Sequence, residues 1–195
     1  MNQDFANFEI IILDNASTDN TKLALQGFND QRIANVHHDH NIGMVRNINF
    51  GIEKAIGKFC VILCADDSWA PDFLSRSLAV QEKKRCLTFT NSMIRQNNQE
   101  YIYKNVFNGN NSITAWHLIR NLCGIPLSSL MFPIDKPPIL FDETLPFNCD
   151  LEYVLRRVTQ EKLRLRYIDY PGVYVNLHSD NETRRYNVTA ENMKL

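Results

Sequence analysis

Two adjacent carboxylates, Asp66 and Asp67, are the residues of this sequence best placed to do chemistry. They follow the apolar run Val61–Leu63, and Pro71 opens a new segment four residues later. Such a run is typical of a buried strand in a parallel sheet, and open α/β sheets bind ligands at the carboxyl ends of their strands. Adjacent carboxylates repel each other and stay ionised most easily beside water, donors or a cation. A divalent metal ion carrying a phosphate ligand would satisfy both, and a solvated turn with an Asp helix cap is the alternative.

Other segments share this arrangement. A second mostly apolar strand begins at Phe8 and ends at the carboxylate Asp14, after which capping residues follow. Ile48, Ile52 and Ile56 recur at helical spacing between the two acidic strand ends. Alternating strands and helices of this kind predict a parallel sheet. The expected helices cover 20–28, 45–56, 114–121 and 150–161 and a segment from Pro71; the expected strands cover 9–13, 33–36, 59–63, 86–90, 128–132, 165–168 and 173–176, with a hairpin within 91–112.

Together, the segments 8–21, 41–57 and 61–71 resemble the family 2 glycosyltransferases, inverting nucleotide-sugar enzymes of the GT-A fold. The family pattern is Asp-x-x-Ser-x-Asp-x-Thr after a strand, then Asn-x-Gly-x-x-x-Ala-x-Asn-x-Gly, then an acidic strand end and a downstream Pro. Asn47 stands where the family has the middle Ala. The resemblance implies an α/β fold with an open, mostly parallel sheet flanked by helices.

The resemblance also implies site residues. Asp14 would contact the nucleotide base or its ribose, Asp66 would contact the ribose, and Arg46 would pair with the diphosphate. Asp67 would bind the metal ion, Mn²⁺ or Mg²⁺, and the late His178 would complete the metal shell. A cap for Asp14 and a solvated helix charge for Arg46 are the alternatives.

The segment from Phe141 to Arg156 resembles the part of the family that carries the general base. The resemblance assigns that role to Asp150, which we expect to open a helix; an N-cap is the alternative, and Glu152 is the second candidate for the base. The acid that usually precedes the base is Cys149 here.

Two further departures concern the metal ion and the first strand. An acid usual two residues before Asp66 is replaced by Cys64, and a thiol is a poor ligand for Mg²⁺ or Mn²⁺. Family members also begin with a strand-helix unit of roughly 25–30 residues, which is expected to be absent here. Its absence would leave an unpaired inner sheet edge and an open half of the nucleotide site.

Composition fits one domain of 195 residues, with residues 1–90 as a nucleotide-binding half and 91–195 as an acceptor-side half. The formal net charge of −1 gives no footprint for nucleic acid, and no apolar run is long enough for a transmembrane helix. Five cysteines without a Cys-x-x-Cys motif argue against a disulfide framework or a zinc site and favour a reducing compartment. We therefore expect a cytoplasmic protein, either free or peripheral at the membrane.

The implied function is inverting transfer of a sugar from a nucleotide-diphosphate sugar, with a UDP-sugar favoured, to a hydroxyl of a saccharide or lipid-linked acceptor in cell-surface polysaccharide synthesis. The alternative is a non-catalytic, truncated domain that acts as a remnant or a binding module. Three aromatic residues could contact sugars, although ordinary packing is the alternative for each of them: Trp69, Tyr101 and Tyr103.

Overall fold

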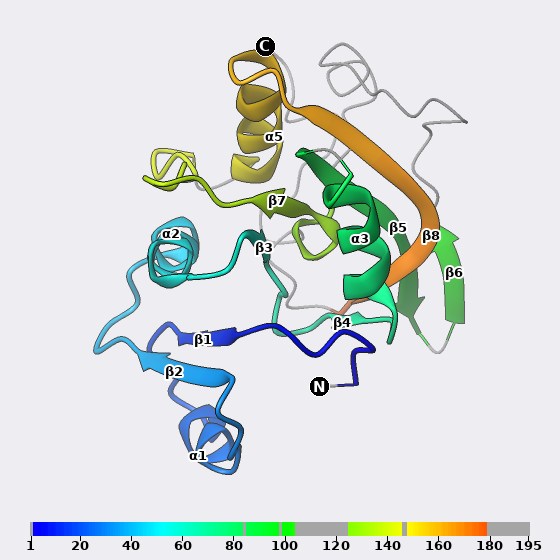
Figure 1. The fold of residues 1–195 in the computed structure, drawn as a ribbon. Coiled ribbons are helices and arrows are strands. Elements are labelled where there is room, and N and C mark those ends of the chain that lie inside the picture. The colour runs from blue at the N-terminus through cyan, green and yellow to red at the C-terminus, as the bar shows by residue number, and fades with distance from the viewer. Residues whose placement is uncertain (1, 84, 98, 104–124, 146–147, 179–195) are drawn as a thin grey trace, which may run out of the picture.

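The computed structural model describes residues 2–83, 85–97, 99–103, 125–145 and 148–178 (Figure 1). Strands and helices alternate through the first half of the chain, and strands predominate afterwards. The elements in chain order are β1 (Ile10–Asp14), α1 (Thr21–Gln26), β2 (Ile33–His37), α2 (Met44–Lys54), β3 (Phe59–Val61), β4 (Ser68–Trp69), α3 (Phe73–Gln81), β5 (Cys86–Gln96), β6 (Gln99–Tyr103), the 3₁₀ helix η1 (Leu127–Ser129), β7 (Met131–Pro133), α5 (Cys149–Thr159) and β8 (Arg164–Asn176).

The described strands form two sheets. One contains β1 and β2 in parallel, and the other has the order β3-β7-β5-β8-β4 with β6 added to β5. Parallel pairing joins five residue pairs between β1 and β2 and ten between β5 and β8, whereas no antiparallel pairing exceeds five residue pairs. The α/β architecture is confirmed. Parallel pairing predominates by the number of paired residues, but four of the six strand pairings among the described residues are antiparallel.

Each of the two sheets has an edge strand that lines a shared cavity and has no pairing partner on one side among the described residues. Within the described residues, β1 pairs only with β2 and β3 pairs only with β7. Residues 10–13 of β1 and 59–61 of β3 line the same cavity, of about 2760 Å³. The unpaired inner edge that the sequence predicted is therefore present on both strands.

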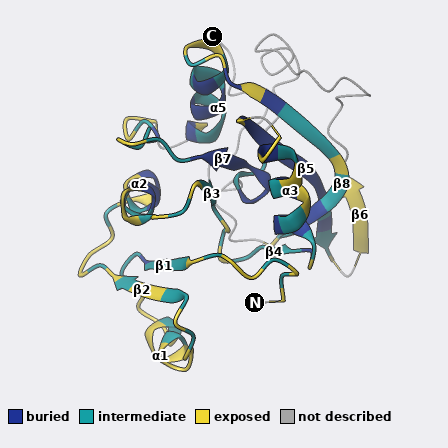
Figure 2. Ribbon diagram, viewed as in Figure 1, coloured by how far each residue is buried: buried dark blue, intermediate teal, exposed yellow. Residues whose placement is uncertain are grey.

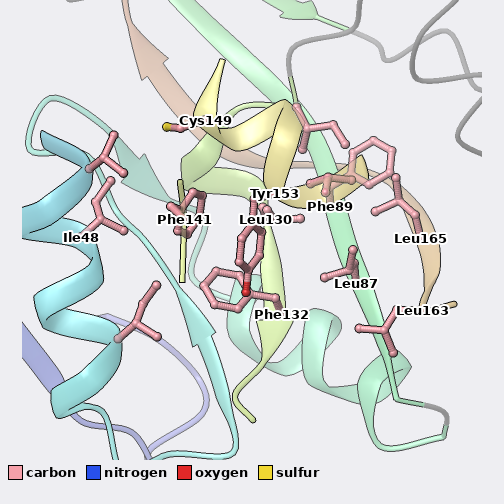
Figure 3. Packing of buried hydrophobic residues seen from close by; sticks show 14 residues of the cluster. Ile48, Leu87, Phe89, Leu130, Phe132, Phe141, Cys149, Tyr153, Leu163 and Leu165 are labelled. Carbon is pink, nitrogen blue, oxygen red and sulfur yellow. The ribbon is translucent and has the colours of Figure 1, made fainter. Parts of the chain in front are cut away.

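Helices pack against both faces of the larger sheet. Leu87 and Phe89 of β5 pack in a cluster with α2 and α5, in which Tyr153 stacks on Phe141 at 4.1 Å between ring centroids (Figure 3). Because neighbouring residues of a strand point to opposite faces, Thr88 faces the other way, toward Gln81 of α3. Figure 2 shows buried residues concentrated in β5 and β7, while α1 has none. Phe132→Ala, in the cluster that contains Leu87 and Tyr153, should lower the free energy of unfolding by about 3–5 kcal/mol.

Helix α2 fastens the first part of the chain to the segment before α5. Asn49 is buried, and its amide both donates to the Phe141 carbonyl (2.9 Å) and accepts from the Phe141 N–H (2.8 Å). Gly51 lies so close to β1 that an added Cβ would approach the Leu13 Cδ1 to 2.6 Å. The Asn-x-Gly pair of the sequence motif therefore serves packing: one residue ties down a distant backbone and the other lets strand and helix approach.

Several predicted element boundaries are wrong. The two short strands expected after residue 164 are one strand, β8, because two register shifts against β5 pass over Asp169, Tyr170 and Gly172 while Pro171 stays opposite Asn91. Pro71 precedes α3 rather than opening it. The expected strand over 128–132 begins instead as η1. The helix expected over 114–121 lies outside the described residues.

Candidate active site

The loop after β3 holds Asp67 in a defined position. The hydroxyl of Ser128, from η1, donates to Asp67 Oδ2 at 2.6 Å and accepts from the Cys64 N–H at 3.1 Å. Burial is the main cause of a raised pKa at Asp67; the charge of Asp66 raises it further, and the Ser128 hydrogen bond opposes both effects. A nearby cation would stabilise the ionised form of a carboxylate whose pKa is raised by burial.

Asp66 is held from the end of β8. The side-chain amide of Asn176 donates to the Asp66 backbone carbonyl, and His178 Nε2 lies 3.3 Å from Asp66 Oδ2. The predicted metal ligand His178 therefore meets the acid pair through Asp66. The described residues contain no group of three or more His, Cys, Asp or Glu side chains that could hold a metal ion. A metal ion here would need further oxygen ligands from a bound molecule, as Mg²⁺ and Mn²⁺ commonly have in phosphate sites.

Asp150, from α5, lines the same cavity as Asp66 and Asp67. Burial and the charges of Asp67, Asp66 and Asp150 raise the pKa of the Cys64 thiol, while the hydrogen bond with Ser128 lowers it. The acid pair and the predicted base thus lie near enough to Cys64 to affect its thiol, and all four residues line one cavity. Burial also raises the pKa of Asp150 itself, which suits a general base because its proton affinity moves toward the working pH.

The start of α5 differs from the prediction. The helix begins at Cys149, and its N-cap is Asn148 in a left-handed conformation (φ 60°), so Asp150 is the second helical residue. Both the expectation that Asp150 opens the helix and the N-cap alternative are wrong. The Asp150 carboxylate accepts the N–H of Leu151 at 2.8 Å.

The neighbours of Asp150 are engaged elsewhere. Glu152 accepts a hydrogen bond from Arg156 at 2.6 Å, and Arg156 also donates to the Leu140 carbonyl. Cys149, which stands where the family has an acid, is buried in the apolar cluster (Figure 3). Of these three residues at the start of α5, Asp150 has the carboxylate best placed for a ligand.

Arg46 lies in the first turn of α2 and is exposed. It lines the cavity that Asp66, Asp67 and Asp150 also line. Among the described residues, none of the ion pairs includes its guanidinium. Its five donors can therefore meet an anionic ligand directly.

Asp14 differs from the other candidates because the hydrogen bonds of its carboxylate engage both oxygens. Oδ1 accepts the Ser17 N–H at 2.9 Å, and His37 Nδ1 lies 2.7 Å from Oδ2. These bonds, the one to Ser17 foremost, lower the pKa of Asp14 to about 2 despite its burial. Asp14 is not among the residues that line the cavity. The geometry is that of the loop cap that the sequence offered as the alternative.

The three aromatic candidates for sugar contact lie in different environments. The Trp69 indole N–H donates to the Ser128 carbonyl at 2.7 Å, and its ring stacks on Phe73. Tyr101 and Tyr103 are 48% and 44% exposed and line the cavity, so neither ring belongs to the core. Sequence reasoning missed Ser128 and Asn176. A serine pair inside the apolar run Leu127–Phe132 was the available signal for Ser128.

None of the helices in the described residues combines the length and apolar character needed to cross a bilayer. The known proteins to which the chain is similar are glycosyltransferases. It is 28% identical over 136 residues to the Escherichia coli UDP-Glc:alpha-D-GlcNAc-diphosphoundecaprenol beta-1,3-glucosyltransferase WfgD, covering 64% of this chain and 48% of that protein. It is 33% identical over 88 residues to TuaG of Bacillus subtilis, which is named for teichuronic acid biosynthesis, covering 44% of this chain and 35% of that protein.

A crystal structure of S. aureus TarS 1-349 in complex with UDP-GlcNAc superposes with a TM-score of 0.73 at 16% identity, over 94% of this chain and 54% of that one. This likeness confirms the GT-A fold. The chain spans between a third and a half of the length of WfgD and TuaG. The family described as Glycosyl transferase family 2 matches residues 1–129. With two thirds of its length matched and the fold in agreement, the chain belongs to glycosyl transferase family 2.

Proposed function

We propose that the chain transfers a sugar from a UDP-sugar to a hydroxyl of a saccharide or lipid-linked acceptor, with inversion, in the synthesis of cell-surface polysaccharide. The observation that carries the proposal is that Asp66, Asp67, Asp150 and Arg46 line one cavity, where the three carboxylates lie near enough to Cys64 to raise the pKa of its thiol. Such transfer needs charge neutralisation at the leaving diphosphate and a general base at the acceptor hydroxyl. The reaction class follows from family membership and from the motifs that resemble the family pattern.

On the donor side, Arg46 is the residue proposed to bind the diphosphate, because a guanidinium pairs with phosphate oxygens in a bidentate manner. Asp67 would hold Mn²⁺ or Mg²⁺, with Asp66 binding the ribose or a bridging water and His178 adding a nitrogen ligand. The carboxylate oxygens suit such hard cations. When bound, the cation would neutralise charge on the leaving diphosphate. Asp14 is retained as the proposed contact to the nucleotide base through its loop, since its own oxygens are engaged.

On the acceptor side, Asp150 would take the proton from the attacking hydroxyl. Its burial raises its pKa, and this makes its carboxylate a stronger base than an exposed aspartate. Direct attack opposite the leaving diphosphate inverts the anomeric centre, and no covalent sugar-enzyme intermediate is needed. Glu152 is not the preferred base because Arg156 holds it.

The substrate classes rest on the relatives. The printed name of WfgD gives UDP-glucose as donor and a lipid-diphosphate-linked N-acetylglucosamine as acceptor, and TarS was crystallised with UDP-GlcNAc. By analogy, residues 1–90 would bind the nucleotide and 91–195 the acceptor. The reaction would take place in the cytoplasm, with the protein free or peripheral at the membrane.

The direct test is transfer from UDP-glucose or UDP-GlcNAc to N-acetylglucosamine linked through an α-diphosphate to an alkyl chain, with Mn²⁺ present. Nuclear magnetic resonance of the product should show a β-linkage from the α-linked donor. Binding of UDP without any turnover of either donor would instead favour the non-catalytic alternative. A product with retained configuration would contradict the role given to Asp150.

A further inference from the structure

The hairpin of β5 and β6 carries two exposed tyrosine rings that neither the core nor the reaction uses. Tyr101 and Tyr103 are separated by one residue on an edge strand, so they point to the same face of the sheet. Both line the large cavity, together with Ile94 of β5, whereas Ile102 does not. Exposed rings facing a shared cavity can bind a ligand at little desolvation cost to polar groups.

A continuous row of residues connects this face to the acid pair. Tyr103 lies opposite Ser92, Ser92 opposite Val173, and Val173 opposite Trp69 in the strand register. Paired residues share a face, so all four project on the same side of the sheet. Trp69 follows Asp67 by two residues. Three strand spacings separate Trp69 from Tyr103, which is about 14 Å along the sheet.

A second connection runs through the end of β8. Asn176 donates to the Asp66 carbonyl and lies opposite Arg95 of β5, which in turn lies opposite Glu100 of β6. This row lies on the opposite face of the sheet from the tyrosines, but it places the tyrosine-bearing strand two strand spacings, about 10 Å, from the strand that holds Asp66. That separation exceeds one sugar ring but suits the next ring of a saccharide.

The charges of the hairpin lie on its other face. Arg95 and Glu100 form an ion pair at 2.7 Å, and both alternate away from the tyrosines. Beside the tyrosines on this face, Ser92 and Ile94 of β5 are buried, and Gln96 and Gln99 lie opposite each other at the end of the hairpin. An uncharged surface of aromatic rings flanked by amides suits a neutral, hydroxyl-rich ring, whose C–H face packs on tyrosine while its hydroxyls bind amides.

We propose that Tyr101 and Tyr103 form a stacking platform for a sugar ring of the acceptor, beyond the ring whose hydroxyl is glycosylated. This rests on the function proposed above, because the platform extends the acceptor side of that site. It assigns to the β5–β6 hairpin a role in selecting acceptors by length. A single-sugar acceptor would not reach the platform, whereas an oligosaccharide would.

The test is calorimetric titration of the chain, loaded with UDP and Mn²⁺, with oligosaccharides of N-acetylglucosamine and of glucose, one to four units long. We expect longer saccharides of at least one series to bind more tightly than the monosaccharide. Tyr101→Ala and Tyr103→Ala should each weaken binding of the longer saccharides by about threefold to tenfold and leave the monosaccharide unchanged. Tyr101→Phe should retain the wild-type preference because it keeps the ring.

Ile102→Ala is the matched control, since Ile102 is equally exposed on the same strand but faces away. Affinity that does not depend on length, or an equal loss in Ile102→Ala, would overturn the platform. UDP affinity is measured on the same samples. A wild-type chain that binds no UDP would contradict the proposed function, whereas intact UDP binding without a length preference would contradict the platform alone.

Discussion

The hydroxyl of Ser128 donates a 2.6 Å hydrogen bond to Asp67, and the two residues come from segments 61 positions apart. The same oxygen accepts the N–H of Cys64, so one side chain fixes both the carboxylate and the loop that carries it. The antiparallel pairing of β3 with β7 brings η1 beside this loop. The position of the proposed metal ligand is thus set by a residue that would not touch the metal ion.

Ser128→Ala should weaken Mn²⁺ binding in the presence of UDP by about tenfold, because residues that orient a ligand contribute strongly to metal affinity. Ser129→Ala is the control, since the Ser129 hydroxyl donates to the Pro126 carbonyl instead. Both variants should lose about 1–2 kcal/mol of stability. Titration calorimetry separates the two effects, and equal Mn²⁺ affinity in both variants would remove Ser128 from this role.

Asp67→Asn should abolish the joint stabilisation of the fold by Mn²⁺ and UDP. Each ligand completes the coordination of the other, and a ligand that binds the native state raises its stability by mass action. Differential scanning fluorimetry should show a larger shift with both ligands than with either alone in wild type. Asp142→Asn, on a separate exposed turn, should keep that shift. The same shift in Asp67→Asn as in wild type would exclude Asp67 as the metal ligand.

The occupied carboxylate of Asp14 gives a pH signature. Its pKa is lowered from 3.8 to about 2 in the folded chain, so its stabilising contribution is complete above pH 3.8 and is lost as the pH falls toward 2. In urea titrations, Asp14→Asn should be less stable than wild type at pH 5, and this difference should shrink between pH 3.8 and 2. Asp19→Asn, an exposed neighbour, should change the same window less. A difference that stays constant across the window would refute the assignment.

Asn49→Ala should lower the free energy of unfolding by about 2–4 kcal/mol, because it leaves both the N–H and the carbonyl of Phe141 without their buried partner. Urea denaturation is the measurement. Asn47→Ala, two positions earlier, should cost about 1 kcal/mol, since the Asn47 side chain makes a part-buried 3.0 Å hydrogen bond with His38 and a long 3.4 Å contact with the Leu13 carbonyl. Equal losses of unfolding free energy in the two variants would show that the buried hydrogen bonds between Asn49 and Phe141 add no more stability than the contacts of Asn47.

What the sequence could predict here was set by local patterns. The stripe of Val45, Ile48 and Ile52 fixes the buried face of α2, and apolar runs that end in acids located Asp66 and Asp67 at a strand end. Such patterns are visible because each depends on residues a few positions apart. The family resemblance then added Asp150, which lines the same cavity as the acid pair.

The features that the sequence could not predict depend on pairing between strands that are far apart in the chain. Ser128 looks like an ordinary polar residue in an apolar run until β7 pairs with β3. β8 was split in two because Pro171 and Gly172 normally end a strand, but pairing with β5 continues past them through a register shift. Asp14 carries a strand-end signal like that of Asp66, and only the positions of Ser17 and His37 show that its oxygens are engaged.

The choice between Asp150 and Glu152 as the base yields the sharpest prediction. Asp150→Asn should lower turnover by about 10²–10⁴ and leave UDP affinity unchanged, because a general base acts on the acceptor hydroxyl. Glu152→Gln should lose only its ion pair with Arg156, which should cost less than about 1 kcal/mol of stability with turnover close to wild type. Donor consumption and calorimetric UDP binding are measured for both variants.

The structure also removes one ambiguity from that experiment. The N-cap of α5 is Asn148, so Asp150→Asn does not alter the cap, and the substituted amide oxygen can still accept the Leu151 N–H. A folded Asp150→Asn variant without turnover would therefore report the loss of the carboxylate as a base rather than the loss of the helix start. Near-normal turnover in Asp150→Asn with collapse in Glu152→Gln would reverse the assignment, because it would mean that the carboxylate paired with Arg156 is released when the acceptor binds.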